Sequence, residues 1–348
     1  MTTAFQSFIR QSPPVDVTKP YNKATLNNKT ILITGGANGL GAHMVREWAS
    51  NGANIVIGDV ADALGEELVA DLTTKHPEST FVYQHCDVTD WDSQVALFKA
   101  AVRGSPSGCI DIVVPNAGII IPSASTVFEH PTLVDGELPK PNLKTLEVNI
   151  TGVAYTTHLA LYHLPRNPSP DRCILLIGSL ASLIPFPGQP QYVMTKHAVL
   201  GLFRTLRATA FLNGVRVNMI APFYTAKTNM LKAPVEAAFL SGSPGPASIE
   251  DVIDAATRLI ADEDVAGRCL VIGPHMSARG AEGAEDFEDF MVSENGEGKG
   301  RSVWECHAGD YDIVDSFVKR YVYLLYAIEK ARGWFGVLSD IWGVIRRK

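Results

Sequence analysis

The stretch TILITGGANGLG, residues 30–41, decides the fold. Its first five residues form a short apolar run that ends directly in glycines, and a segment with helical periodicity follows from Leu40 to Asn51. This order predicts a buried strand, a tight turn and a helix. Glycines at such a turn let the backbone approach a pyrophosphate closely, and the helix N-terminus offers free N–H groups to the phosphates.

The same alternation of strand and helix continues along most of the chain. Further apolar runs that predict buried strands lie at Asn54–Gly58, Phe81–Gln84, Ile110–Val114, Cys173–Ile177, Val215–Met219 and Cys269–Ile272. Strands that are apolar throughout and are separated by helices indicate a parallel sheet covered on both faces. We therefore predict an α/β fold, a Rossmann-like doubly wound parallel sheet of about seven strands with a helical C-terminal extension.

Composition divides the chain into four parts. Residues 1–28 are polar and contain prolines, which predicts an arm before the fold, and residues 29–275 hold the alternating pattern of the catalytic domain. Residues 276–303 are rich in Gly, Glu and Asp and predict an acidic flexible linker, and residues 304–348 regain helical periodicity. Inside the domain, residues 119–142 carry four prolines, which predicts a long loop.

Overall composition narrows the class of protein. The chain has 348 residues, 46% hydrophobic and 19% charged, which is enough apolar material for a large core. A net charge of −7 argues against a nucleic-acid partner. Five scattered cysteines and nine histidines show no metal-ligand spacing, so we expect no metal site and a reducing compartment. No signal peptide or apolar run of about 18 residues is present, which predicts a cytoplasmic protein.

Asp59 follows the second predicted strand, where a ribose-binding acid is expected. A carboxylate there accepts hydrogen bonds from both hydroxyls of an adenosine ribose and repels the extra phosphate of NADP. Neither Asn38 nor the pair Val60 and Ala61 supplies a cation for that phosphate. The pattern favours NAD over NADP, and the alternative interpretation of Asp59 is a solvent-facing loop acid.

Further motifs follow the later strands in a fixed order. They are Asp87-Val88, Asn116-Ala117-Gly118, Asn149 in VNITG, and Ser179 thirteen residues before Tyr192 with Lys196 four residues after it. Together with the glycine loop, these motifs resemble the short-chain dehydrogenase/reductase family from about Lys29 to Pro274.

The resemblance implies two sets of site residues. The implied catalytic residues are Asn149, Ser179, Tyr192 and Lys196, with Asn149 helping to hold a water that links Lys196 to solvent. The residues implied to bind NAD are Gly35, Asn38, Gly39, Leu40, Gly41, Asp59, Asp87, Val88, Asn116, Ala117, Gly118, Tyr192, Lys196, Pro222 and Thr225. Asn116 is also expected to tie neighbouring strands through its amide.

The chain departs from the family pattern after the sixth strand. Where the family has Pro-Gly, this sequence has Pro222-Phe223, and Thr225 and Thr228 do not stand at the usual offset. Pro115 also replaces a frequent Asn. We therefore expect the lid over the nicotinamide to differ in shape.

The chemistry of the predicted catalytic residues depends on the pKa of Tyr192. Tyrosine is a weak base at neutral pH because its reference pKa is about 10. Tyr192 and Lys196 stand four apart and share a helix face, although such pairs are often only neighbours on a half-exposed face. We expect the Lys196 ammonium to lower the pKa of Tyr192, so that the phenol can take or give the proton of an alcohol.

The predicted pocket walls are apolar and define the expected reaction. No arginine or lysine lies between Ser179 and Tyr192, so a bulky, lipophilic secondary alcohol or ketone, such as a terpenoid, steroid-like or polyketide compound, is expected. The favoured function is its NAD-dependent oxidation. A ketone reductase using NAD(P)H and a non-catalytic NAD-binding scaffold stay open as alternatives.

The C-terminal extension carries an apolar stripe at helical spacing. The stripe consists of Trp334, Phe335, Leu338, Ile341, Trp342 and Ile345. It predicts a helix packed on the body or on a second subunit of a homodimer or homotetramer. A helix lying on a membrane surface, anchored by its tryptophans and basic end, and a lid over the substrate are the alternatives.

Overall fold

The computed structural model describes residues 11–225, Glu236, residues 245–276, residues 301–306 and single positions between 321 and 333. The predicted apolar stripe from Trp334 to Ile345 lies outside these residues. So does most of the predicted acidic linker. Both therefore stay predictions.

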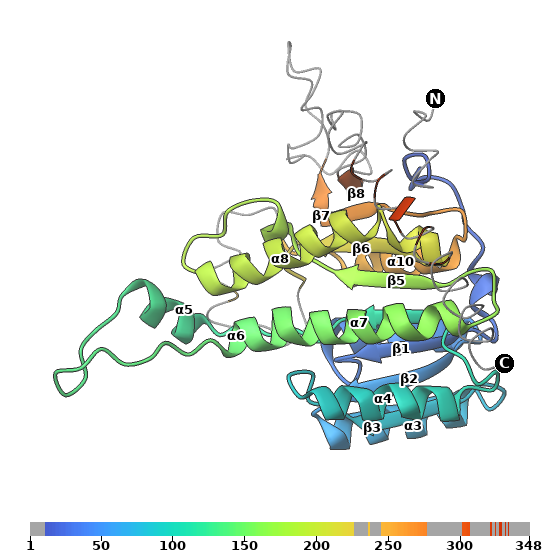
Figure 1. The fold of residues 1–348 in the computed structure, drawn as a ribbon, viewed down its shortest axis with the longest axis horizontal. Helices are drawn as coiled ribbons and strands as arrows, with labels where there is room; N and C mark the ends of the chain where they lie inside the picture. Colours follow the sequence, from blue (N-terminus) through green and yellow to red (C-terminus); the bar gives the residue numbers. More distant parts are fainter. Residues whose placement is uncertain are drawn as a thin grey trace, which may run out of the picture.

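One eight-stranded sheet forms the centre of the structure, with the strand order β3-β2-β1-β4-β5-β6-β7-β8 (Figure 1). The strands are β1 Thr30–Thr34, β2 Asn54–Asp59, β3 Phe81–His85, β4 Ile112–Pro115, β5 Cys173–Ile177, β6 Arg216–Pro222, β7 Cys269–Met276 and β8 Arg301–Cys306. All neighbours from β3 to β7 are parallel, and β8 pairs antiparallel with β7 at the edge. The predicted doubly wound α/β fold is confirmed, with one strand more than the sequence suggested.

Helices cover both faces of the sheet. One face carries α2 Gly39–Ser50, α3 Asp62–Lys75 and α10 Ile249–Ala261, and the other carries α4 Trp91–Gly104, α7 Val153–His163 and α8 Pro190–Leu206. The side chains of each strand alternate between the two cores. In β1, Ile31 and Ile33 contribute to the first core and Leu32 to the second, all with no exposed surface. This alternation explains why the strand is apolar at every position.

Short elements complete the fold. They are α5 Pro122–Glu129, α6 Lys144–Leu146, the 3-10 turns η1 Lys23–Leu26, η3 Leu164–Arg166, η4 Leu180–Ser182 and η5 Ala210–Asn213, and the π-helical turn η2 Glu147–Gly152. The predicted loop 119–142 therefore contains a helix, α5, which begins at Pro122 because proline is favoured in a first helical turn. The following residues, 130–142, are exposed and project from the body (Figure 1).

The predicted boundaries at both ends of the domain need correction. The arm predicted for residues 1–28 packs on the domain from Gln11 onward: Leu26 is 1% exposed in the first core, and the Tyr21 hydroxyl donates to Asp254 Oδ1 over 2.9 Å. At the other end, the predicted border between linker and helical extension falls inside strand β8. These residues form a strand because Val303 packs on the first core and Trp304 lies against Gly273.

Candidate active site

A cavity of about 810 Å³ lies at the carboxyl ends of β1, β2, β4, β5 and β6. The strand order turns back between β1 and β4, which is where open α/β sheets bind ligands. All site residues predicted from the sequence line this cavity except Asn149, which lies behind its wall. The structure thus brings together residues that are distant along the chain.

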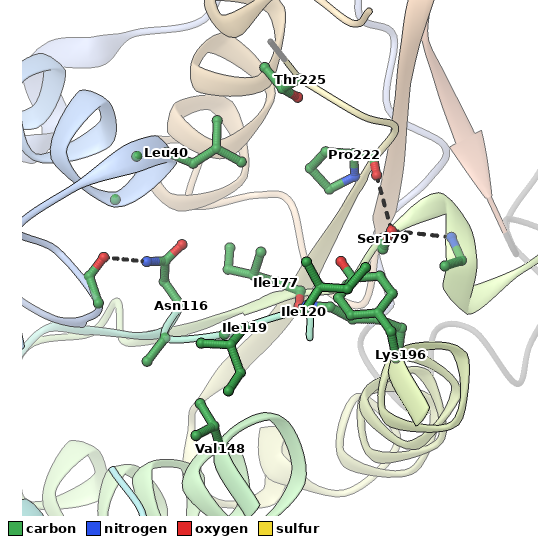
Figure 2. A pocket seen from close by; sticks show the side chains of 18 of the residues that line it. Leu40, Asn116, Ile119, Ile120, Val148, Ile177, Ser179, Lys196, Pro222 and Thr225 are labelled. Carbon is green, nitrogen blue, oxygen red and sulfur yellow. Dashed lines mark hydrogen bonds between the residues drawn. The ribbon is translucent and has the colours of Figure 1, made fainter. Parts of the chain in front are cut away.

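The glycine loop is held in one conformation by Asn116. The Asn116 side-chain amide donates to the carbonyl oxygens of Thr34 and Gly35 over 3.0 and 2.7 Å, as the sequence analysis expected (Figure 2). Gly35 has φ +65°, and a Cβ at Gly41 would lie 2.1 Å from the Gly35 carbonyl oxygen. Only glycine therefore fits at residue 41.

Helix α2 begins at the cavity and offers an anion site there. Asn38 caps the helix, and its side-chain oxygen accepts from the Gly39 amide over 2.8 Å. The other N–H groups of the first turn have no partner within the helix, and the helix dipole places a partial positive charge at this end. Backbone and dipole therefore fit a pyrophosphate beside Gly39, Leu40 and Gly41, which line the cavity.

Asp59 ends strand β2 at the rim of the cavity and has a fixed orientation. Its carboxylate accepts from the amide of Ala37 over 3.0 Å and from the amide of Ala61 over 3.1 Å. The Tyr83 hydroxyl also donates to the Asp59 carbonyl oxygen over 2.7 Å. A carboxylate held in this way beside the phosphate loop fits the diol of a ribose.

The predicted NAD-binding residues Asp87 and Val88 are held in place by a residue that sequence reasoning missed. Gln94 is fully buried, and its amide donates to the carbonyl oxygens of Val88 and Gly152 over 2.6 and 2.9 Å. Thr89 donates to the Asp87 carboxylate through its amide and its hydroxyl, and these bonds lower the pKa of Asp87. The role of Gln94 could have been predicted from the sequence, because a glutamine on the apolar face of a helix indicates a buried hydrogen-bonding side chain.

Ser179, Tyr192 and Lys196 meet at the opposite end of the cavity. Ser179 follows β5, and its hydroxyl donates to the Pro222 carbonyl over 3.4 Å (Figure 2). Tyr192 and Lys196 lie on α8, each 8% exposed, with Lys196 Nζ 5.6 Å from the centre of the Tyr192 ring. The ammonium donates to the Ile177 carbonyl oxygen over 3.0 Å. A phenol, a hydroxyl and an amine are therefore grouped at one wall.

The electrostatics of this group differ from the expectation. Burial raises the pKa of Tyr192, and a hydrogen bond with Ser179 opposes that rise. Burial also lowers the pKa of Lys196 to about 8, because the ammonium loses its hydration. The Ser179 hydrogen bond therefore favours the Tyr192 phenolate, while the Lys196 ammonium donates to the Ile177 carbonyl oxygen.

Asn149 lies in the π-helical turn η2 and joins two walls of the cavity. Its side chain accepts from the Ile119 amide and donates to the Ile119 carbonyl, both over 2.8 Å. It also donates over 3.2 Å to the Thr195 hydroxyl, which in turn donates to the Tyr192 carbonyl over 2.7 Å. The π-turn bulges the helix here, as such turns do at functional sites. Sequence reasoning missed both this π-turn and Thr195.

The remaining wall is apolar. The described residues that form it are Ile119, Ile120, Leu180, Ile184, Pro185, Phe186, Phe223 and Tyr224. They come from the segment after β4, from η4 and the residues that follow it, and from the segment after β6. Ile184 is 47% exposed, so much of this wall is open to a ligand.

The departure from the family pattern after β6 has a visible consequence. Phe223 donates its amide to the Ile272 carbonyl over 2.7 Å and packs its ring against the first core. Thr225 is buried and forms a bridge with Ala247 at the entrance to α10. The polypeptide after Pro222 therefore continues alongside the sheet before it reaches residue 226. Thr228 lies outside the described residues.

The part of the chain that the structure describes holds neither a cluster of metal-ligating side chains nor a helix that could span a membrane. No group of three or more His, Cys, Asp or Glu side chains in this part of the chain is arranged to hold a metal ion. Among the helices of the same residues, none has both the length and the apolar character needed to cross a bilayer.

Several proteins similar to this chain are dehydrogenases. The 5'-hydroxyaverantin dehydrogenase of Dothistroma septosporum is 35% identical over 282 residues, which cover 76% of this chain and 89% of that protein. The 5'-hydroxyaverantin dehydrogenase of Emericella nidulans is 34% identical, covering 80% and 92% of the two chains. An NADP-dependent dehydrogenase of a Phoma species is 28% identical, covering 86% and 89%.

The family model described as short chain dehydrogenase matches residues 29–238. That range contains the glycine loop, Asp59, Asn149, Ser179, Tyr192 and Lys196. An oxidoreductase role and a nicotinamide cofactor follow from the match together with the dehydrogenase relatives. This chain belongs to the short-chain dehydrogenase/reductase family.

Proposed function

We propose that this protein oxidises a bulky, lipophilic secondary alcohol to the ketone with NAD⁺, using Tyr192 as the general base. The observation that carries the proposal is the arrangement of the cavity. Asp59 and the glycine loop form one end, and Tyr192, Ser179 and Lys196 stand at the other, against an apolar wall.

Different residues of the chain bind the cofactor, orient the substrate and transfer the proton. When bound, NAD⁺ supplies a hydride acceptor at its nicotinamide ring. The first turn of α2 holds the pyrophosphate, Asp59 the adenosine ribose and Lys196 the nicotinamide ribose. Ser179 orients the substrate oxygen by a hydrogen bond, and Tyr192 removes its proton. General-base catalysis of this kind contributes roughly 10²–10⁴-fold to the rate.

The position of Asp59 supports a preference for NAD over NADP as the cofactor. Its carboxylate is fixed by two backbone amides and repels a phosphate on the neighbouring ribose hydroxyl. The cationic side chains among the described residues that line the cavity are Lys144 and Lys196. Lys144 lies 3.4 Å from the Thr89 hydroxyl and 3.8 Å from a Glu147 carboxylate oxygen, next to Asp87 and not to Asp59. The NADP-dependent relative shows that the family also includes the other preference.

The apolar wall supports a lipophilic substrate. Buried apolar area gives about 25 cal/mol per Å² before the costs of binding, so such a wall favours a large hydrocarbon surface. Two relatives are named for 5'-hydroxyaverantin, a hydroxylated compound. We include that compound among the candidates for this chain.

The test compares NAD⁺ and NADP⁺ with the purified full-length protein and a panel of lipophilic secondary alcohols, 5'-hydroxyaverantin included. We expect NADH to form with at least one alcohol and NADP⁺ to be a poor substitute. Asp59→Ala should narrow the difference between the two cofactors, because it removes both the ribose hydrogen bonds and the repulsion. A wild-type preference for NADP⁺ would show that the role given to Asp59 is wrong.

A further inference from the structure

Two cysteines face each other across the edge of the sheet. Strands β7 and β8 run antiparallel, and their register places Cys269 directly opposite Cys306. Both residues lie on the second-core side: Cys269 has no exposed surface, and Cys306 is partly buried against the same cluster. Neither residue belongs to the cavity at the carboxyl ends of the strands, because Cys269 begins β7 at the other end of the sheet.

Direct opposition in an antiparallel pair brings two residues within the range of a disulfide. Opposed residues have Cα atoms about 4.5–5.5 Å apart, and side chains of such a pair point to the same face. Disulfides need Cα separations of about 4.4–6.8 Å. The two thiols already contact each other through a hydrogen bond, and this bond, followed by burial, raises the pKa of Cys269. Both sulfurs are thus adjacent, and Cys269 is held as a thiol at neutral pH.

Two other buried cysteines, Cys173 and Cys86, are not placed to compete with Cys306 for Cys269. Cys173 lies on β5, and strand β6 separates it from β7, since Cys173 pairs with Arg216 and Cys269 pairs with Met219. Cys86 is buried beside Asp87 near the adenine end of the cavity. The arrangement therefore offers Cys269 one cysteine neighbour on the adjacent strand.

Strand β8 also joins the sheet to the N-terminal residues. Glu305, next to Cys306, accepts from the Val15 amide over 2.6 Å and pairs with the buried Arg268 guanidinium over 3.0 Å. Arg268 in turn donates to the Ser12 carbonyl. A covalent bond between β7 and β8 would therefore fasten a strand that organises both the sheet edge and residues 12–15.

We propose that Cys269 and Cys306 form a redox modification site, in which a peroxide converts the facing thiols into a cross-strand disulfide. In the first step the more accessible Cys306 thiol takes one oxygen atom from hydrogen peroxide, giving a sulfenic acid and one water. The Cys269 sulfur then attacks that sulfur, the S–S bond forms, and the second water leaves with the Cys269 proton. Overall, two thiols lose two electrons and two protons, and one peroxide is reduced to two waters.

The experiment uses the full-length protein, reduced with dithiothreitol, freed of reductant and then treated with hydrogen peroxide. Remaining thiols are alkylated in denaturant, and the unreduced digest is analysed by mass spectrometry. We expect a peptide pair linking Cys269 to Cys306 that disappears on reduction. The thermal midpoint of the oxidised protein should rise by roughly 5 °C and return with dithiothreitol.

Two variants make the result specific. Cys306→Ser should lose both the linked peptide and the rise in thermal midpoint, whereas Cys109→Ser, which alters the other cysteine of intermediate exposure, should keep both. NADH binding should stay within twofold on oxidation, because the pair lies away from the cavity. Recovery of Cys269 as an alkylated thiol after Cys306 has been oxidised, or a disulfide between any other pair, would overturn the proposal.

Discussion

The cavity side next to β1 and β2 is held by hydrogen bonds from fixed side chains, whereas the side next to α5 and η4 is formed by apolar side chains. Asn116 makes two bonds to the glycine loop, and Asp59 accepts from two backbone amides. On the apolar side, Ile184 is 47% exposed. The segment 130–142, which continues from that side, projects from the body (Figure 1).

This difference indicates which kind of ligand each side of the cavity is suited to bind. A cofactor of constant shape is suited to a rigid, directional site, because each hydrogen bond requires one geometry. A lipophilic substrate is suited to a surface whose contribution scales with contact area and has no direction. We therefore expect large, all-or-none effects from substitutions among the bonded residues and graded effects from substitutions on the apolar wall.

Tyr192→Phe should produce the largest effect and show that proton transfer is separate from cofactor binding. We expect the turnover number to fall by about 10²–10⁴-fold, because the phenol acts on the substrate proton. The affinity for NADH, measured by fluorescence titration, should stay within twofold. Tyr162→Phe is the matched control, since this tyrosine is 53% exposed on α7. Substantial turnover in Tyr192→Phe would exclude Tyr192 as the base.

Gly41→Ala should break the rigid side of the cavity. The new Cβ would lie 2.1 Å from the Gly35 carbonyl oxygen, so the loop must move, and displacements of about 1 Å can cost about 10²-fold. We expect the turnover number to fall by that order and NADH to bind more weakly than to the wild type. Gly201→Ala serves as the control because this glycine lies in α8 with no neighbouring atom within 4 Å of an added Cβ. Unchanged NADH binding in Gly41→Ala would mean that the loop is not rigid.

Lys196→Met should damage catalysis and cofactor binding while stabilising the fold at neutral pH. Burial lowers the pKa of Lys196 from 10.5 to about 8. Below pH 8 both folded and unfolded chains hold the proton, and the buried ammonium costs stability. Between pH 8 and 10.5 the folded chain has released the proton and the unfolded chain has not, so this cost declines as the pH rises. The full cost is at most about 3 kcal/mol.

Denaturant unfolding at pH 7, 9 and 10.5 measures this effect. The Met variant should be more stable than wild type at pH 7, and the difference should shrink toward pH 10.5. Lys99→Met, at an exposed lysine of α4, should show no such dependence. A Met variant that is less stable than wild type at pH 7 would show that the Ile177 hydrogen bond outweighs the burial cost.

The parts that could be predicted from the sequence are those fixed by local spacing. Once the strand and the helix have formed, the conformation of the glycine loop is fixed by its own residues. The four-residue separation likewise places Tyr192 and Lys196 on one face of their helix. Asp59 could be predicted because it ends a strand next to the loop strand. Strand β8 could not be predicted from the sequence, because its six residues follow an acidic, glycine-rich stretch. They are held as a strand by pairing with β7 and by the ion pair with Arg268.

Features that depend on burial and on distant contacts were not visible in the spacing. The π-turn at Asn149 lies within a continuous helical pattern, so its bulge could not be read from periodicity. Burial, a property of the whole site, raises the pKa of Tyr192, and the spacing of Tyr192 and Lys196 could not show this. Thr195 gave no signal because a threonine within a helix is common.

Thr195→Val tests whether the bonds around Asn149 extend the rigid region to the catalytic group. The substitution removes a buried hydroxyl that accepts from Asn149 and donates to the Tyr192 carbonyl. We expect the turnover number to fall about fivefold, in line with about 1 kcal/mol for one lost hydrogen bond, with NADH affinity within twofold. The pH profile of turnover should also shift. Thr195→Ser keeps the hydroxyl and should restore the turnover number and its pH profile. If the Val and Ser variants behave alike, Thr195 contributes by packing and not by its hydrogen bonds.

Ile184→Ala should change substrate binding only slightly, the smallest effect of these substitutions, and it tests the apolar wall of the cavity. About half of the Ile184 side chain is open to a ligand, and covering that area is worth about 1 kcal/mol, or roughly a fivefold change in affinity. We therefore expect the KM of a bulky alcohol to rise two- to fivefold, by roughly that free energy, with the turnover number unchanged, because no hydrogen bond or proton is involved. Leu138→Ala, at a residue that is 62% exposed on the projecting segment, should leave both values unchanged. A collapse of turnover in Ile184→Ala would mean that the apolar wall positions the reacting atoms as strictly as the bonded side, and the contrast between the two sides would fail.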